Sequence, residues 1–144
     1  MTNDEKFMRA AIEEARTAER EGEIPIGAVV VSDGIIVGRG HNMTEALNDV
    51  TAHAEMIALT SAEQTLGGKY LKKCTLYVTI EPCLMCAGAI GWSQMGRVVF
   101  GALDAKRGYS RLSDKAFHPK TIVQGGILED ECASLMKDFF EKRR

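Results

Sequence analysis

The stretch Thr51-Ala52-His53-Ala54-Glu55 places an imidazole and a carboxylate at the predicted start of one helix. Downstream, Pro82-Cys83-Leu84-Met85-Cys86 supplies two thiols at the predicted start of another. Side chains that commonly bind zinc occur at His53, Cys83 and Cys86. Glu55 is an additional carboxylate that is not needed as a ligand. Three protein ligands with an open fourth position are typical of catalytic zinc, whereas structural zinc usually has four. The two stretches therefore predict a catalytic zinc site and a fold that brings two helix starts together.

The elements on either side of these stretches alternate between strand and helix patterns. Apolar, β-branched runs predict strands at 28–31, 35–40, 74–80, 97–101 and 121–123. Amphipathic spacing predicts helices at 3–21, from about 51 to 67, from 82 to about 94, and at 130–144. We expect Asn3 or Asp4, and Asp49 or Thr51, to cap the first two helices, and Pro82 to lie in the first turn of the third. Asp33-Gly34 predicts a hairpin, so the pattern indicates an α/β fold: a three-layer α/β/α sandwich with a mixed five-stranded sheet.

Composition is that of one globular domain covering residues 1–144, with 45% hydrophobic and 26% charged residues. The net charge of -2 means that any nucleic-acid surface must be local. No apolar run approaches the roughly 18–20 residues of a membrane span, and the first residues show no secretory signal. We therefore expect a cytoplasmic protein without membrane attachment. Cys74 and Cys132 lie singly in apolar patterns, and we interpret them as core residues.

Each motif also has a simpler explanation. Glu55 could be a first-turn carboxylate that complements the helix dipole. The Cys83-Cys86 pair, between a strand and a helix, could be a thioredoxin-like redox pair, but that would leave His53 and Glu55 without a role. Positions two apart on a helix differ by about 200°. His53 and Glu55 can therefore both face inward only where the chain enters the helix.

The pair His53-Ala54-Glu55 and Pro82-Cys83-Leu84-Met85-Cys86 matches the H-x-E…P-C-x-x-C pattern of zinc-dependent nucleobase deaminases. The sequence thus resembles the cytidine deaminase-like superfamily and, through segments 76–83, 86–89, 96–102 and 126–140, the bacterial tRNA-specific adenosine deaminases within it. The resemblance implies one zinc per subunit, held by His53, Cys83 and Cys86, with Glu55 as proton shuttle. It also implies a homodimer, and substrate contacts from Asn42, the backbone of Ala54, and Asp104. Without the resemblance, Asn42 would be a common turn residue.

Three positions depart from that family pattern. Val50 stands where the familiar motif has proline, and Leu103 stands where a basic residue is common. Trp92 resembles the guanine deaminase branch, which acts on a free base, and we include it among the substrate-binding candidates. Its large apolar surface is also typical of an interface or core aromatic.

The segment from Lys106 to Lys120 is locally basic and carries interleaved rings. Candidate RNA-binding residues are Lys106, Arg107, Arg111 and Lys120, with Arg143 in the basic end 142–144. Cations for phosphates and rings such as Tyr109, Phe117 and His118 for splayed bases suit a single-stranded RNA loop. The alternative is an ordinary solvated loop.

These observations predict hydrolytic deamination of adenosine to inosine at the wobble position of a tRNA anticodon, with zinc and without an organic cofactor. One alternative is deamination of guanine or another free nucleobase or nucleoside. A second, from another class, is a non-catalytic zinc- and RNA-binding subunit. The presence of Glu55 argues against that alternative, because such a subunit needs no proton shuttle.

Overall fold

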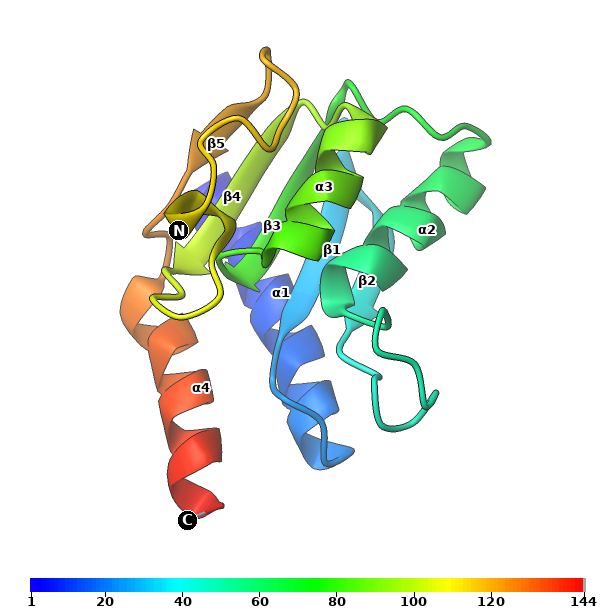
Figure 1. Cartoon of the computed structure of the whole chain (residues 1–144). Coiled ribbons are helices and arrows are strands. Elements are labelled where there is room, and N and C mark those ends of the chain that lie inside the picture. The colour runs from blue at the N-terminus through cyan, green and yellow to red at the C-terminus, as the bar shows by residue number, and fades with distance from the viewer. Residues whose placement is uncertain (144) are drawn as a thin grey trace.

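The computed structural model describes residues 1–143, and the predicted contribution of Arg144 to the basic end lies outside them. The elements are α1 (Asn3–Arg20), β1 (Gly27–Ser32), β2 (Ile35–His41), α2 (Ala54–Leu66), β3 (Cys74–Ile80), α3 (Leu84–Ser93), β4 (Arg97–Ala102), the short 3-10 helix η1 (Tyr109–Arg111), β5 (Ile122–Gln124) and α4 (Glu129–Lys142) (Figure 1). Their order is the predicted one. No helix among residues 1–143 combines the length and apolarity needed to cross a bilayer.

The five strands form one mixed sheet in the order β2-β1-β3-β4-β5, which confirms the predicted fold class. β1 pairs antiparallel with β2 and with β3, whereas β3, β4 and β5 are parallel. The β1–β2 hairpin turns through Asp33 and Gly34, both with positive φ (54° and 75°), as a two-residue hairpin turn of this kind requires. With this topology, the ends of β2, β3 and β4 lie at the same edge of the sheet, and the chain segments that leave them meet there.

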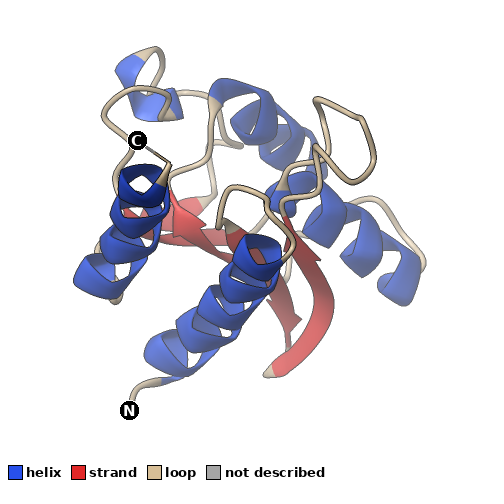
Figure 2. Cartoon of the chain, turned by 90° about the horizontal axis from the view of Figure 1, so that it is seen from below, coloured by secondary structure: helices blue, strands red, loops and turns tan. Residues whose placement is uncertain are grey.

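Helices cover both faces of the sheet (Figures 1 and 2): α2 and α3 pack on one face, and α1 and α4 pack on the other. One core contains Ala58 of α2 and Ile90 of α3, and the other contains Met8 of α1 and Cys132 of α4. Cys74 lies in the first core, so both single cysteines are buried, as predicted. Apolar burial on both faces is the main stabilising contribution of a three-layer fold.

The helix α2 packs unusually close to β2, at two glycines. A β-carbon on Gly38 or Gly40 would collide with the backbone of α2 at Ala58 and Ala54 respectively. Any other residue there would push the helix away from the sheet. The first turn of α2, which begins with Ala54, is thereby held against the end of β2.

The helix starts differ from those predicted. Thr2, not Asn3 or Asp4, caps α1, in a capping box with Glu5. Asp4 instead accepts hydrogen bonds from Arg97 and from the Tyr77 hydroxyl, at 2.7 to 2.8 Å, which tie α1 to the sheet.

At the two later helices the N-cap residues are His53 for α2 and Cys83 for α3. Asp49 and Thr51 bond to each other in the preceding loop, and Pro82 lies just outside α3. The sequence preference for Asp and Thr at N-caps was misleading here, because both N-cap positions are occupied by residues of the predicted metal site.

Candidate metal and catalytic site

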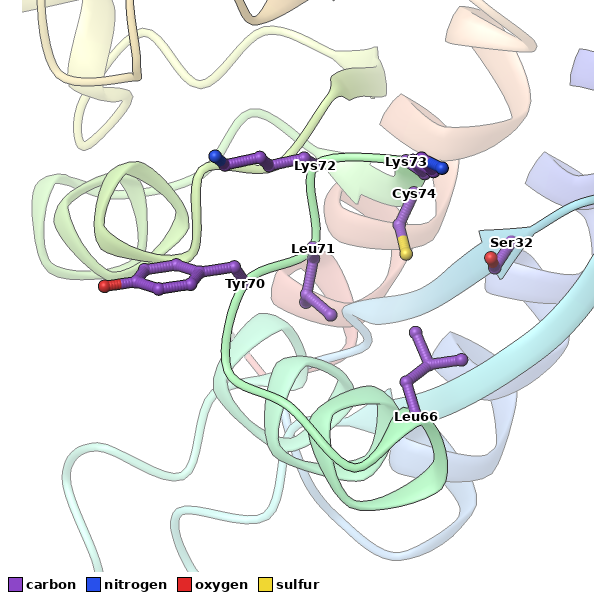
Figure 3. Close-up of a pocket in the computed structure, with 7 residues that line it drawn as sticks. All are labelled: Ser32, Leu66, Tyr70, Leu71, Lys72, Lys73 and Cys74. Atoms are coloured by element: carbon purple, nitrogen blue, oxygen red, sulfur yellow. The ribbon is translucent and has the colours of Figure 1, made fainter.

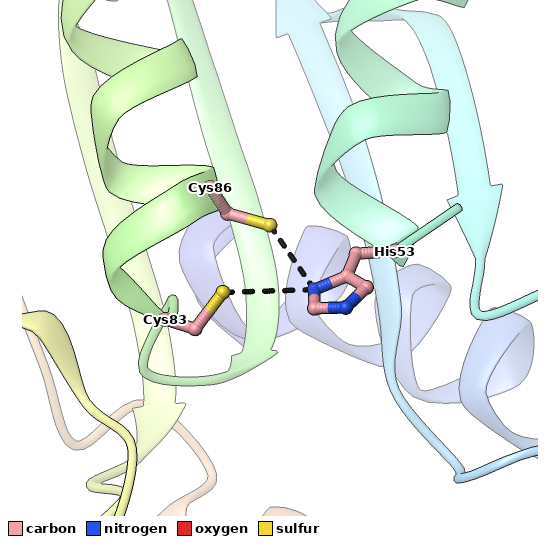
Figure 4. A group of neighbouring side chains, drawn as sticks. All are labelled: His53, Cys83 and Cys86. Carbon is pink, nitrogen blue, oxygen red and sulfur yellow. Dashed lines mark hydrogen bonds between the residues drawn. The ribbon is translucent and has the colours of Figure 1, made fainter. Parts of the chain in front are cut away.

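The structure brings the three predicted metal ligands together. The side-chain donor atoms of His53, Cys83 and Cys86 all lie within 4.8 Å of one another. His53 Nδ1 is 3.6 Å from Cys83 Sγ and 3.4 Å from Cys86 Sγ (Figure 4). With Zn–N near 2.0–2.1 Å and Zn–S near 2.3 Å, tetrahedral N and S ligands would lie roughly 3.5 Å apart. The spacing and the donor types therefore fit zinc.

Two of these side chains reach the cluster because they stand at helix N-caps. His53 (φ -78°, ψ 155°) and Cys83 (φ -71°, ψ 171°) have extended backbone, and neither side chain caps its helix. Cys86, in the first turn of α3, adds its thiol from the same helix end. Since His53 precedes the helix proper, the 200° separation does not apply to it, and His53 and Glu55 can both face inward. This confirms the geometry predicted for the chain entering the helix.

The cluster favours a thiolate. The pKa of Cys83 is lowered to about 4, first by the hydrogen bond from the Cys86 thiol and also by the one from His53. The pKa of Cys86 is raised because its proton is shared with Cys83, and that of His53 is raised by the Cys83 thiolate. Thiolates at a helix N-terminus are further favoured by the helix dipole. A redox pair would also favour one thiolate, but an imidazole nitrogen that faces both sulfurs is what a metal site requires (Figure 4).

Glu55 lies beside this cluster without belonging to the ligand set. It is in the first turn of α2 and only 3% exposed. Burial is the main cause that raises its pKa to about 7, and its side chain also interacts with Cys86. A carboxylate that served only the helix dipole would gain nothing from this burial. A pKa near neutrality suits a group that both accepts and donates protons.

Asn42 directly follows β2 and is 4% exposed. Its backbone N–H donates to the carbonyl of Ile26, at 3.1 Å, and its side-chain amide makes no hydrogen bond within residues 1–143. Within residues 1–143, every side-chain N or O atom that is closed off from solvent has a hydrogen-bond partner. The Asn42 amide has no such partner, so its polar atoms must be open to solvent. It is thus available to a ligand. Ala54, between His53 and Glu55, is fully buried.

The loop after β4 folds back onto the cysteine segment. Gly108 forms an isolated antiparallel bridge with Cys83, and the Tyr109 N–H donates to the Pro82 carbonyl at 2.9 Å. Asp104 turns this loop by accepting from the N–H groups of Lys106 and Arg107, both at 3.0 Å. Asp104, Lys106 and Arg107 therefore belong to a loop that contacts the metal-ligand segment.

The basic segment is only partly arranged as predicted. Lys106, Arg107, Arg111 and Lys120 are exposed. Tyr109, however, is buried and packs against the half-buried Phe117 with ring centroids 4.6 Å apart, so the prediction that the Tyr109 ring stacks on a base is wrong. The rings build the loop instead. Arg143 lies at the end of α4, over the Phe139 ring.

Trp92 is not at the metal cluster within this chain. It lies near the end of α3, roughly 12 Å along the helix axis from the first turn, and is 84% exposed. Its interpretation as a core aromatic is therefore wrong.

The cleft at Tyr70, Lys72 and Lys73 likewise lies away from the cluster, where β1 ends and β3 begins, and contains none of the predicted site residues (Figure 3).

Two buried carboxylates, Glu23 and Glu81, are not among the residues that the sequence patterns pointed to. Glu23 and Glu81 are 1% and 3% exposed, and both hold loops next to the cluster. Glu81 stands between a strongly apolar strand and Pro82-Cys83, where an acidic residue without a surface role could have been noticed. Glu23 carries no comparable signal, because its partners lie more than twenty residues away.

The fold and the site define a zinc-binding deaminase domain. Residues 1–102 match the family described as "Cytidine and deoxycytidylate deaminase zinc-binding region", and the chain belongs to this family. It is similar over its whole length to the tRNA-specific adenosine deaminase of Bacillus subtilis, with 46% identity covering 100% of this chain and 92% of the relative. The protein of the same name from Streptococcus pyogenes serotype M18 is 43% identical, over 96% and 90% of the two chains.

Solved structures agree with this placement. A structure from work on A-to-I editing by tRNA:A34 deaminases at the wobble position superimposes with a TM-score of 0.84 and 41% identity, covering 90% of this chain and 98% of the other. A guanine deaminase from Bacillus subtilis gives a TM-score of 0.67 and 41% identity, covering 69% and 64%. The fold is therefore shared by relatives with different substrates.

The metal content of the protein tests the ligand set. The purified protein should contain about one zinc per chain, measured by mass spectrometry of metals, and Cys86→Ala should lose most of it, because two side chains hold zinc poorly. Cys132→Ala, which removes an equally buried cysteine from the opposite core, is the matched control and should keep its zinc. A zinc-replete Cys86→Ala protein would remove Cys86 from the ligand set.

Proposed function

We propose that this protein is a zinc-dependent hydrolase that converts adenosine to inosine at the wobble position of a tRNA anticodon. The observation that carries the proposal is the cluster of His53, Cys83 and Cys86 with the buried carboxylate of Glu55 beside it. Three metal ligands and one free general acid–base are the groups that hydrolytic deamination needs. Full-length similarity to tRNA-specific adenosine deaminases supports the choice of substrate.

In the proposed mechanism, His53, Cys83 and Cys86 would hold the zinc ion. When bound, zinc supplies Lewis acidity that makes water a nucleophile near neutral pH. Glu55 takes a proton from the attacking water as its oxygen forms a bond to C6 of the adenine. Glu55 delivers that proton to the ring nitrogen N1 as the C6–N1 double bond becomes single. Glu55 then moves the remaining proton of the new C6 hydroxyl to the amine, and the bond from C6 to the amine nitrogen breaks, which releases ammonia and leaves a carbonyl at C6. A carboxyl pKa near 7 allows both directions of transfer.

Substrate positioning falls to the chain around this centre. Asn42 offers an unpaired amide for a hydrogen bond to the purine, and the backbone of Ala54 lines the base pocket. Asp104 lies near the sugar of the flipped nucleotide. The RNA phosphates are contacted by exposed cations, which favour the phosphate backbone. These cations are Lys106, Arg107, Arg111, Lys120 and, at the end of α4, Arg143.

We further propose that the protein is a homodimer through the exposed face of α3. Leu84, Met85 and Trp92 present apolar surface there, with 49%, 38% and 84% exposure, and Gly88 between them leaves space that a neighbour could enter. A helix with such an uncovered apolar face is typical of an interface. In this arrangement Trp92 contacts the second subunit, and it can reach substrate only at the subunit boundary.

We also propose that the protein is cytoplasmic and consists of one domain. A cytoplasmic location suits a tRNA substrate and the four cysteines, which form no disulfide. We treat residues 1–144 as one deaminase domain, because the helices of residues 1–143 pack on a single sheet.

The second candidate function is deamination of free guanine. It is favoured by the similarity to the guanine deaminase of Bacillus subtilis and by Trp92. The exposed basic loop has no use in an enzyme of that kind, which is why we place the RNA substrate first.

A substrate panel tests this choice. An anticodon stem-loop with adenosine at the wobble position should yield inosine and an equal amount of ammonia, whereas free guanine and cytosine should yield none. Nucleoside analysis and ammonia release measure the two products. Reaction with free guanine alone would contradict the RNA substrate. Failure on every base by a zinc-containing protein would support the non-catalytic subunit instead.

Glu55→Gln tests the proton shuttle. The variant should keep its zinc and lose about 100- to 10,000-fold in kcat, since an amide cannot carry protons and general acid–base catalysis contributes this much. Glu63→Gln, half-buried on the same helix, is the control and should retain activity. Near-normal turnover by Glu55→Gln would exclude Glu55 from the chemistry.

The interface has its own test. Trp92→Ser should shift the protein from dimer to monomer in sedimentation equilibrium, because it removes the largest apolar group of the exposed α3 face. Phe140→Ser changes another exposed aromatic residue, on α4 at the opposite face of the sheet, and should leave the dimer intact. A Trp92→Ser protein that dimerises as strongly as the parent would place the interface elsewhere.

A further inference from the structure

Two buried carboxylates have no role in the proposed chemistry. Glu23 lies between α1 and β1, and Glu81 directly follows β3. Neither is a metal ligand, and neither packs in the two apolar cores. A buried carboxylate is costly unless hydrogen bonds compensate its lost hydration. The partners that supply this compensation indicate what each residue does.

All side-chain partners of Glu23 belong to the loop of residues 43–52, which connects Asn42 to His53. One carboxylate oxygen accepts from the Glu45 N–H at 3.1 Å and from the Thr44 hydroxyl at 3.5 Å. The other accepts from the Ala46 N–H at 2.8 Å. The loop is also closed at its base, where the Met43 N–H donates to the Ala52 carbonyl at 2.9 Å. Glu23 thus holds residues 44–46 of the loop against the segment that connects α1 to β1.

Glu81 makes the same arrangement with the loop of residues 103–111. One oxygen accepts from the Asp104 N–H at 3.1 Å, and the other accepts from the N–H of Ser110 at 3.0 Å and from its hydroxyl. The carboxylate therefore joins the two ends of the loop. Gly108 lies so close to Glu81 that a β-carbon there would collide with the carboxylate.

We propose that Glu23 and Glu81 are positioning residues that hold the two loops beside the metal cluster in the conformation that binds the nucleotide. The inference rests on the proposed function for the identity of that nucleotide. Each carboxylate uses its two oxygens for two backbone N–H groups of one loop, which are consecutive for Glu23 and six residues apart for Glu81. Charge-assisted bonds of this kind are stronger and more directional than neutral ones, and they favour one loop conformation over others.

The kinetic consequence follows from the population of that conformation. If a loop is in the binding conformation only part of the time, apparent affinity falls by that fraction, while the bound complex reacts as before. Gln in place of Glu keeps the shape but turns an NH2 group towards a backbone N–H, so one of the two bonds is lost. The effect should therefore appear in KM and leave kcat nearly unchanged.

The experiment compares Glu23→Gln, Glu81→Gln and Gly108→Ala with the full-length parent protein. Glu141→Gln, an exposed glutamate on α4, is the matched control. Zinc content, amide hydrogen exchange, and kcat and KM on the anticodon stem-loop are measured for each.

We expect KM to rise about tenfold in the three variants, with kcat within about threefold and zinc unchanged. Exchange should quicken at Glu45 and Ala46 in Glu23→Gln, and at Asp104 and Ser110 in the other two, but not in β3. Glu141→Gln should match the parent protein.

Several results would overturn the proposal. A fall in kcat at constant KM, a loss of zinc, or exchange that quickens in β3 as much as in the loop would each give these glutamates another role. If the parent protein does not act on the stem-loop, the proposed function fails by itself. Hydrogen exchange then decides this proposal: faster exchange confined to the loop supports it, and unchanged exchange refutes it.

Discussion

The constraint on which this structure depends is that two helices must begin at the same point on the edge of one sheet. His53 and Cys83 are the N-cap residues of α2 and α3, and each directs its side chain to the other helix instead of capping its own. Each helix gives up the contribution of a capping side chain, on the order of 1 kcal/mol. In return, the unpaired N–H groups and the dipoles of two helix ends favour negative charge where the thiolates stand.

The sheet topology makes this convergence possible. Because β3 and β4 run parallel, the segments that follow them leave at the same edge, and the antiparallel β1–β2 hairpin brings Asn42 to that edge as well. The close packing of α2 on Gly38 and Gly40 then fixes where His53 stands relative to β2. Asp4 contributes from the opposite face, where its bonds to Tyr77 and Arg97 hold α1 across the strands that precede the site. The metal cluster is thus placed by packing between layers and not by its own loops.

The sequence was most informative where a property is local. Strand and helix positions follow from hydrophobic period, and the ligand trio follows from residue types that few other roles require together. The N-caps could not be predicted, because His53 and Cys83 are poor capping residues and the better ones nearby, Asp49 and Thr51, bond to each other. Tyr109 was misjudged because its neighbour in space, Phe117, lies in the same irregular segment, where no period indicates burial. The partners of Glu23 and Glu81 are distant in sequence, so nothing near either residue predicted them.

The helix starts and the loops of the site differ in how they are fixed to the sheet. This difference helps to explain how one family can include enzymes that act on different bases. The groups proposed to carry out the reaction lie at the starts of α2 and α3, which pack side by side on one face of the sheet. Several of the groups proposed to meet the substrate, among them Asp104, Lys106 and Arg107, lie instead in a loop that the Glu81 carboxylate helps to connect to that scaffold. A change in such a loop alters few core contacts, whereas a change in the helix starts disturbs the packing of α2 and α3 on the sheet. The chemistry is therefore constrained by the fold far more strongly than the choice of base. This is consistent with structural relatives that include both tRNA adenosine and guanine deaminases.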